Sequence, residues 1–218
     1  MAEPVLYGAA YSVYVRIARL VLAEKGVGYR LEEVDIFAAG GPPTDYLARQ
    51  PFARIPAFEH DGFRLYEAGA IARYVDEAFP GPALQPKEPR VRARMNQAIS
   101  ILDSYAYRSL VWEVFVERVR KPQQGSASDE AAIAAALPRA RTCLGALADL
   151  AGPALFMVDG RLSLADLHAA PIFVYFLMTP EGRAMLAEFP RLDAWWAAMA
   201  ARPSLAATRS PLEAPVQA

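Results

Sequence analysis

The sequence is poor in cysteine and histidine, the side chains on which disulfide scaffolds and many metal sites depend. It contains one cysteine, Cys143, and two histidines, His60 and His168, in 218 residues. A single cysteine cannot form a disulfide within the chain, and the two histidines are too far apart in sequence to indicate a local metal site. The composition therefore disfavours a disulfide-stabilised scaffold and predicts no metal.

An excess of charge of one sign is also missing, because 23 lysines and arginines oppose 24 aspartates and glutamates, for a net charge of −1. Without a basic excess, no surface is available to neutralise phosphates or to attract anionic lipids. No apolar stretch approaches the roughly 20 residues that a membrane-spanning helix needs. The first residues lack a basic segment followed by a long apolar one. We therefore expect a cytoplasmic protein that binds neither nucleic acid nor membrane.

The first half of the sequence contains a regular order of elements. Residues 5–7 are a short apolar run that ends at Gly8, and the segment after it has apolar residues at helical spacing. Ser12 stands at the N-cap position of this helix, and Gly26 lies just past its end. Residues 29–36 then alternate and are rich in β-formers. The pattern predicts strand, helix and strand, with a right-handed crossover.

A breaker-rich loop, FAAGGPP at residues 37–43, follows and leaves room only for a short and irregular helix. Residues 55–59 and 63–66 predict two strands joined by an Asp-Gly hairpin turn. Residues 67–79 then show an apolar stripe at helical spacing. The first half thus predicts the order β-α-β, loop, β-β-α.

The second half is rich in alanine and has no convincing strand. Four prolines between residues 80 and 89 interrupt all periodicity. A chain of this length accommodates one domain or two small ones. We therefore expect two domains, one at residues 1–82 and one at residues 90–218.

Three features predict local structure in the second half. Residues 91–119 form a long amphipathic segment, which is either one bent helix or two. Ser163 and Asp166 form a capping box, which predicts a well-specified helix start. The small, polar and proline-rich tail from Pro203 predicts a loosely ordered end.

Four segments, taken in order, resemble the soluble glutathione transferases. They are YGAAYSVYVRIARLVLAEKG, QPFARIPAFEHDG, LYEAGAIARYVDE, and LSLADLHAAP with FPRLDAWWAAMAARPS. The chain is most similar to a bacterial member of the serine-type, phi-like branch, because of where Ser12 stands after the glycine that ends the first strand. The resemblance implies an α/β thioredoxin-like N-terminal domain that holds glutathione as co-substrate, an all-α C-terminal domain, and a homodimer.

Ser12 is the residue to which the resemblance assigns activation of the glutathione thiol. A thiol with a pKa of about 8.5 needs roughly 2.7 kcal/mol of preference for the thiolate to lower that pKa by about two units. A hydroxyl donor supplies about 1.5–3 kcal/mol and a helix N-terminus about 0.3–1 kcal/mol more, a range that includes the preference needed from Ser12. Two alternatives stay open: Ser12 is only the N-cap of its helix, or Tyr7, at the end of the first strand, is the donor.

The resemblance also assigns residues that hold glutathione itself. Pro56 corresponds to the family's cis-proline, which turns the backbone of Ile55 towards the cysteinyl part; otherwise it is a strand-opening proline on an edge. Glu67 pairs with the ammonium of the γ-glutamyl group while helix N–H groups take its carboxylate, or it is only an acid favoured by the helix dipole. Ala68 stands where the family usually has serine, which removes one hydroxyl donor.

A second departure from the family concerns the glycyl carboxylate of glutathione. Plant-type relatives place histidine and lysine in the loop after the second strand, where this chain has Gly41 and Pro42. Arg54 either compensates for those missing cations or is a solvated surface charge. The departures at residues 41, 42 and 68 motivate a second hypothesis: a transferase-fold protein that binds apolar ligands or partners with weak or no glutathione catalysis.

The predicted reaction is attack of the glutathione thiolate on a small apolar electrophile held by small and aromatic side chains, for each of which core packing is the alternative role. These residues are Ala10, Tyr11, Phe37, Tyr105, Tyr107 and Trp112. Isomerase, peroxidase or dehalogenase chemistry on the same scaffold also stays open, because a fold does not fix the reaction. We interpret Cys143, in a helix among leucines, as a buried apolar residue and not as a nucleophile.

Phe52 is a large apolar residue in a loop flanked by breakers. Several branches of the family insert an aromatic side chain from this loop between helices of the partner's helical domain. The resemblance therefore implies that Phe52 anchors the homodimer, where a two-fold axis would apply its burial twice. The alternative is a phenylalanine tucked under its own loop.

Overall fold

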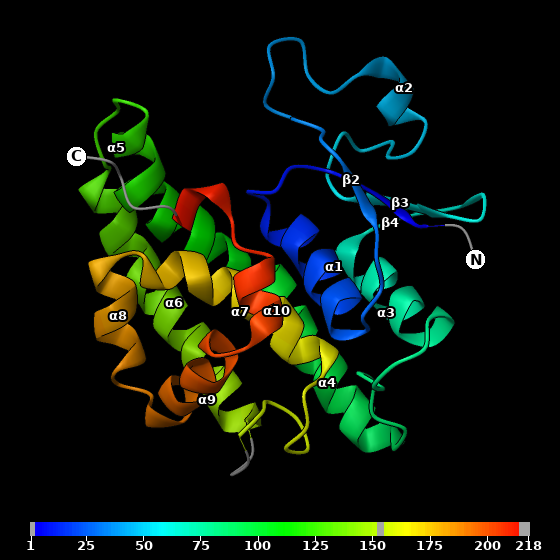
Figure 1. The fold of residues 1–218 in the computed structure, drawn as a ribbon. Coiled ribbons are helices and arrows are strands. Elements are labelled where there is room, and N and C mark those ends of the chain that lie inside the picture. The colour runs from blue at the N-terminus through cyan, green and yellow to red at the C-terminus, as the bar shows by residue number, and fades with distance from the viewer. Residues whose placement is uncertain (1–2, 152–154, 214–218) are drawn as a thin grey trace. The chain divides into compact units, whose positions relative to one another are not determined.

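The computed structural model describes residues 3–151 and 155–213, and it divides into two compact units (Figure 1). The first unit combines the chain up to Ala83 with the segment from Pro203 onwards, and the second is Leu84–Arg202. The C-terminal segment thus groups with the first unit, which differs from the expected domain at residues 90–218. We describe each unit by itself.

The first unit is built on a four-stranded sheet with the strand order β2-β1-β3-β4. Its strands and first helices are β1 (Val5–Tyr7), α1 (Val13–Glu24), β2 (Arg30–Glu32), α2 (Thr44–Leu47), β3 (Ala57–His60), β4 (Phe63–Tyr66) and α3 (Ala68–Ala78). Strand β1 pairs parallel with β2 and antiparallel with β3, which pairs antiparallel with β4. The predicted order of elements and the parallel first pair are confirmed.

Helix α1 begins and ends where its sequence predicts. The Oγ of Ser12 accepts a hydrogen bond from the backbone N–H of Val15 at 3.4 Å, and Gly26 has a φ of 67° just past the end of the helix. The apolar stripe that includes Ile17 and Leu20 is buried. Helices α1 and α3 lie together on one side of the sheet, with α2 on the other side (Figure 1).

The second strand is shorter than the predicted span of residues 29–36. Only Arg30–Glu32 pairs with β1, and the last bond on that side runs from the N–H of Gly8 to the carbonyl of Glu32 at 2.9 Å. A strand needs a partner for its backbone groups. Since β1 ends at Tyr7, the residues beyond Glu32 have nothing on that side to pair with.

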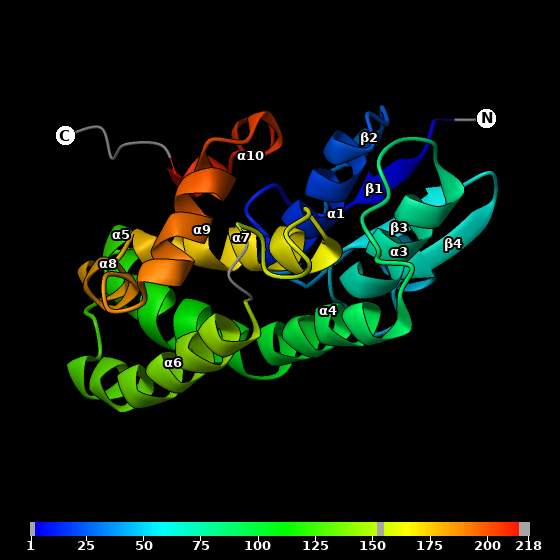
Figure 2. The same ribbon diagram turned by 90° about the horizontal axis from the view of Figure 1, so that it is seen from below.

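The second unit is helical. Its elements are α4 (Pro89–Ile101), η1 (Leu102–Arg120), α5 (Lys121–Gln123), α6 (Glu130–Leu150), α7 (Leu164–Leu177), α8 (Pro180–Leu186) and α9 (Pro190–Ala200). The first three follow one another without a break, so the amphipathic segment at residues 91–119 is one continuous helical rod (Figure 2). Its middle part, η1, is wound as a π-helix, which its apolar spacing did not predict.

Helix α7 is the core of the second unit, and it is buried from Leu164 to Phe176. Its predicted capping box is confirmed, because the carboxylate of Asp166 accepts from the backbone N–H of Ser163 at 2.8 Å. The same carboxylate also accepts from the backbone of Met157 and from the indole of Trp195, each at 2.9 Å. A fully buried acid is thus surrounded by donors.

The C-terminal segment is better ordered than its composition predicts. It forms α10 (Pro203–Ala207) and the 3-10 helix η2 (Pro211–Glu213), and α10 lies beside α1 in the first unit. The prediction of a loosely ordered end is therefore wrong for residues 203–213, because polar groups of α1 hold this segment. Residues 214–218 of the predicted tail lie outside the described residues.

Candidate functional site

Three loops of the first unit meet at one edge of the sheet. Tyr7, at the end of β1, pairs with Ala57, at the start of β3, and Ala57 pairs with Tyr66, at the end of β4. The loop after β1, the segment before β3 and the turn after β4 must therefore share this edge. The residues that the sequence predicts to bind glutathione all lie in these three connections.

Gly8 shows how closely two of these connections approach. Its φ is 150°, and a Cβ atom at this position would lie 2.4 Å from Cγ2 of Val15 and 3.3 Å from Cβ of Ile55. The loop before α1 and the segment before β3 are thus in van der Waals contact. Only glycine fits between them.

Ser12 lies in the first of these connections, half-buried at the start of α1. Its oxygen accepts from Val15, which confirms the predicted N-cap. Among the residues that the structure describes, none accepts the hydroxyl hydrogen of Ser12. A hydroxyl accepts and donates at the same time, so the capping role leaves this hydrogen for a ligand.

Tyr7, the alternative donor, packs against residues of α2 and the loop after it. The guanidinium of Arg49 lies 4.9 Å from the centroid of the Tyr7 ring, and the ring of Tyr46 is 6.4 Å away. This packing favours the interpretation of Tyr7 as a residue of the sheet.

The segment before β3 contains the peptide bond that the family resemblance implied. Ile55 and Pro56 are joined by a cis bond, and both are buried, so the prediction of a cis-proline is confirmed. Arg54 is exposed, and its guanidinium makes no hydrogen bond or ion pair within the described part of the chain.

Tyr46 holds this segment, and sequence reasoning missed it. Its hydroxyl donates to the backbone carbonyl of Arg54 at 2.7 Å, and burial raises the pKa of this phenol. Tyr46 therefore stays protonated and fixes the backbone beside Ile55. A tyrosine in a short irregular helix gives no sequence signal for this role.

Glu67 and Ala68 form the third connection, at the start of α3. Glu67 has a φ of 70°, in the left-handed region that favours glycine, and its exposed carboxylate is unpaired among the described residues. No side chain caps α3, and Ala68 is buried. A carboxylate beside uncapped helix N–H groups suits a ligand that carries both an ammonium and a carboxylate.

Comparison with known proteins shows the family to which the chain belongs. The glutathione S-transferase N-terminal domain model matches residues 6–83, and the C-terminal domain model of the same family matches residues 106–203. The chain belongs to the glutathione S-transferase family. Conjugation of glutathione is the general activity of this family, and the predicted fold class is confirmed.

The relatives include plant transferases of the phi class. Glutathione S-transferase F13 of Arabidopsis thaliana is 26% identical over 91% of each chain, and glutathione S-transferase 4 of Zea mays is 28% identical over 94% of this chain and 92% of the relative. The solved structure of glutathione S-transferase III in apo form has a TM-score of 0.87 at 26% identity and covers all of both chains. These similarities agree with the phi-like branch.

Two of the residues predicted for the electrophile lie together in the first unit of this transferase. The rings of Tyr11 and Phe37 are stacked with centroids 6.3 Å apart. Asp35 organises both, because its Oδ1 accepts from the Tyr11 hydroxyl at 3.0 Å and from the backbone of Phe37 at 2.9 Å. Phe37 is 63% exposed, which argues against the alternative of core packing for this residue. Ala10, next to Tyr11, is half-buried.

The other three predicted electrophile residues lie on η1 in the second unit. Tyr105 is 65% exposed and Trp112 is 42% exposed, so core packing does not explain either side chain. Tyr107 is half-buried. Their role at an electrophile site stays a prediction.

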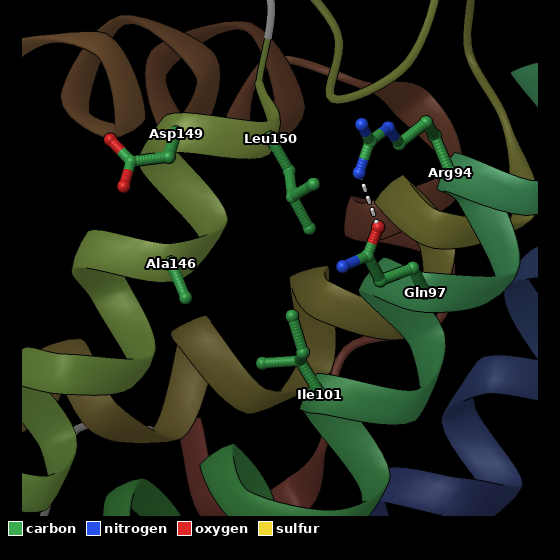
Figure 3. A pocket seen from close by; sticks show the side chains of 6 residues that line it. All are labelled: Arg94, Gln97, Ile101, Ala146, Asp149 and Leu150. Atoms are coloured by element: carbon green, nitrogen blue, oxygen red, sulfur yellow. Dashed lines mark hydrogen bonds between the residues drawn. The ribbon is translucent and has the colours of Figure 1, made fainter.

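A cavity of about 440 Å³ lies in the second unit between α4 and α6 (Figure 3). It is lined by Arg94, Gln97, Ile101, Ala146, Asp149 and Leu150. Arg94 donates to the side-chain carbonyl of Gln97 at 2.7 Å along one wall, while Ile101, Ala146 and Leu150 face one another across the space. The cavity contains none of the residues predicted to bind glutathione.

The cysteine of the second unit lies outside the proposed glutathione site. Cys143 is buried with its sulfur 3.9 Å from the Ser109 hydroxyl, and burial raises the pKa of its thiol, which supports its interpretation as an apolar residue. Over residues 3–151 and 155–213, no cluster of three or more histidine, cysteine or acidic side chains is arranged to hold a metal. In the same ranges, no helix combines the length and apolar character needed to cross a membrane.

Proposed function

We propose that this protein joins the thiolate of glutathione to a small apolar electrophile, with Ser12 donating a hydrogen bond to the thiolate. The observation that carries the proposal is the geometry of Ser12, whose oxygen caps α1 while its hydrogen stays available. The N-terminus of α1 adds about 0.3–1 kcal/mol of preference for a nearby anion. Together with the hydroxyl, this is enough to keep the thiol ionised at neutral pH.

Glutathione is anchored by the other two connections at the same edge of the sheet. In the proposed complex, Glu67 pairs with the γ-glutamyl ammonium, and the uncapped N–H groups at Ala68 bind its carboxylate. The backbone of Ile55, next to Pro56, pairs with the cysteinyl part. Arg54 binds the glycyl carboxylate.

The electrophile lies against the stacked rings of Tyr11 and Phe37, next to Ser12 in the chain. An exposed stack of two rings offers a flat apolar surface. The thiolate attacks the electrophilic carbon, and the leaving group departs with its electron pair. A cytoplasmic location for this reaction stays a prediction of the sequence.

Turnover of a generic aryl halide tests the role of Ser12. Removal of one donor to a developing or resting anion costs about 10²-fold in rate, so Ser12→Ala should lower kcat/KM by about that factor. Tyr7→Phe is the matched control, because it removes the other candidate hydroxyl, and it should change kcat/KM less than about twofold. Equal turnover by wild type and Ser12→Ala, or a large loss in Tyr7→Phe, would show that Ser12 is not the activator.

A second candidate function is a transferase-fold binding protein with weak or no glutathione catalysis. It is favoured by Ala68 and by the Gly41-Pro42 loop, which lack anchors that the family resemblance implied. Calorimetric titration separates the two. Glutathione binding tighter than about 1 mM, or roughly 4 kcal/mol, supports the transferase, whereas no binding together with retention of an apolar dye supports the binding protein.

We also propose a homodimer anchored by Phe52. The side chain of Phe52 is 66% exposed, which favours an anchor over a ring tucked under its own loop; the backbone N–H of Phe52 donates to the Gln50 side chain at 2.7 Å. In the dimer, the ring enters the cavity between α4 and α6 of the second copy. Burial of a Phe side chain is worth about 1.5–3 kcal/mol, twice over by symmetry.

Sedimentation of Phe52→Ala tests the anchor. The variant should dissociate to monomers on dilution and retain its helical signal. Phe37→Ala is the matched control, since Phe37 is 63% exposed in the same unit but lies at the proposed electrophile site. A Phe52→Ala variant that stays dimeric and melts at a lower temperature would contradict the proposal.

A further inference from the structure

The guanidinium of Arg16 is a buried charge outside the proposed glutathione site. Arg16 lies on α1, and its side chain is only 2% exposed. Burial of a charge is costly unless the charge is paired and hydrogen-bonded. Arg16 therefore depends on partners that the rest of the fold must supply.

Those partners include three residues of the C-terminal segment. Arg16 Nη1 donates to Oε1 of Glu213 at 2.7 Å, its Nη2 donates to the carbonyl of Leu205 at 3.0 Å, and its Nε donates to the hydroxyl of Thr208 at 3.4 Å. Glu213 is fixed in turn, because Oε1 also accepts from the backbone of Ser210 at 2.6 Å. The segment thus surrounds one guanidinium from several sides.

Arg16 is also part of the turn that presents Ser12. Its backbone N–H donates to the carbonyl of Ser12 at 2.9 Å, next to the bond from Val15 to the Ser12 hydroxyl. Any rotation or fraying of the first turn of α1 therefore moves Arg16 and Ser12 together.

Two further bonds tie the segment to α1. Arg19 donates to the carbonyl of Thr208 at 3.2 Å, and the hydroxyl of Ser204 donates to the carboxylate of Glu24 at the end of the helix. The segment is thus attached to α1 at three side chains, those of Arg16, Arg19 and Glu24. Of these attachments, the one at Arg16 lies nearest to Ser12.

We propose that the ion pair of Arg16 and Glu213 positions Ser12: it holds the first turn of α1 in the orientation in which the Ser12 hydroxyl meets the glutathione thiolate. This inference rests on the proposed function of Ser12. Arg16 and Glu213 act through the helix as positioning residues. The segment at residues 203–213 is then part of the machinery for thiol activation, although it supplies no reacting group.

Glu213→Gln tests the ion pair, because glutamine keeps the size and one acceptor oxygen but removes the charge. Titration of the ultraviolet absorbance of bound thiolate should show that the apparent pKa of bound glutathione rises by about half a unit to one unit. At neutral pH, kcat/KM should fall by about 3- to 10-fold and recover at alkaline pH, while KM for glutathione changes less than about twofold.

Ser204→Ala is the matched control. It loosens the same segment at the other end of α1, so it should leave the pKa of bound glutathione unchanged. If folded Glu213→Gln melts at a lower temperature but keeps the wild-type pKa of bound glutathione, the ion pair is only a structural tie, and the inference is wrong.

A milder variant and a separate control complete the test. If Glu213→Gln does not fold, Glu213→Asp keeps the charge and shortens the reach; a raised pKa of bound glutathione supports the inference, and an unchanged one contradicts it. If Ser12→Ala raises that pKa and both Glu213 variants leave it unchanged, only the positioning role is wrong. If Ser12→Ala itself leaves it unchanged, the proposed role of Ser12 is wrong and the positioning role with it.

Discussion

Helices α1 and α3 begin at the same edge of the sheet, but they begin in different ways. Ser12 caps α1 with its own side chain, whereas α3 has no side-chain cap and follows Glu67 in a left-handed conformation. The capped start presents a hydroxyl hydrogen, and the uncapped start presents backbone N–H groups. In the proposed complex, the start of α1 therefore binds the thiol of glutathione, and the start of α3 binds its γ-glutamyl end.

Gly8→Ala should disrupt the loop that leads into α1, and we expect the largest effect from this variant. The new Cβ would collide with Val15 and crowd Ile55, at a φ that disfavours any side chain. We expect a loss of about 2–4 kcal/mol in the free energy of unfolding and of most transferase activity. Denaturant unfolding measures the free energy of unfolding, and turnover of an aryl halide measures the activity.

Gly28→Ala serves as the control for this variant, since a Cβ at Gly28 would approach only a side-chain oxygen of Glu3 at 3.9 Å. It should leave both quantities near their wild-type values. An equally stable and active Gly8→Ala variant would mean that the loop before α1 is not held against Ile55.

Glu67→Gln should weaken binding of the γ-glutamyl end of glutathione at the start of α3 and leave thiol activation at the start of α1 unchanged. Loss of one charge-assisted hydrogen bond to the γ-glutamyl ammonium should raise KM for glutathione by about 10- to 100-fold, with kcat nearly unchanged. Steady-state kinetics with varied glutathione measure the split. Glu77→Gln, at the other end of α3, is the control, and a fall in kcat rather than a rise in KM would contradict the assignment.

Ala68→Ser should strengthen glutathione binding by adding a hydroxyl donor to the start of α3. The gain of one hydrogen bond should lower KM for glutathione by about 2- to 10-fold. Calorimetric titration measures the Kd for glutathione without turnover, and that Kd should fall by a similar factor. An unchanged affinity would indicate that the ligand carboxylate does not lie at this helix start.

Substitution of Cys143, which lies outside both helix starts, should have the smallest effect. Because burial raises the pKa of its thiol, the thiolate fraction at pH 7 is below that of a free cysteine, and the fraction rises only at more alkaline pH. Cys143→Ala should keep the transferase activity, and the wild-type thiol should react slowly with iodoacetamide at neutral pH. Rapid labelling at neutral pH, or loss of activity, would show that the thiol is accessible or used.

The sequence predicts those parts of the fold that local chemistry decides. The N-cap at Ser12, the capping box of Ser163 and Asp166, and the alternation of strands and helices all follow from neighbouring residues. The end of β2 could not be predicted, because it depends on where its partner β1 stops. The ordered C-terminal segment was missed for the same reason, since Glu213 finds Arg16 only in the folded chain.

In the candidate site, too, some residues could be predicted from the sequence and others could not. The family resemblance led to the cis bond at Pro56 and to the neighbourhood of Ser12 and Glu67, which the sheet register brings to one edge. Tyr46 and Asp35 were missed, because Tyr46 acts through a hydrogen bond to the backbone of Arg54, and Asp35 accepts from Tyr11, which is 24 residues away in the sequence. Neither lies in a sequence pattern that signals such a bond.

The pKa of glutathione bound to the wild type and to Ser12→Ala is the most direct measurement of the central claim. We expect the thiol of bound glutathione in the wild type to titrate about two units below the value of about 8.5 for a free thiol, and close to that free value in Ser12→Ala. The ultraviolet absorbance of the thiolate, followed across pH with saturating glutathione, reports both. Equal pKa values in the two proteins would contradict the account of Ser12.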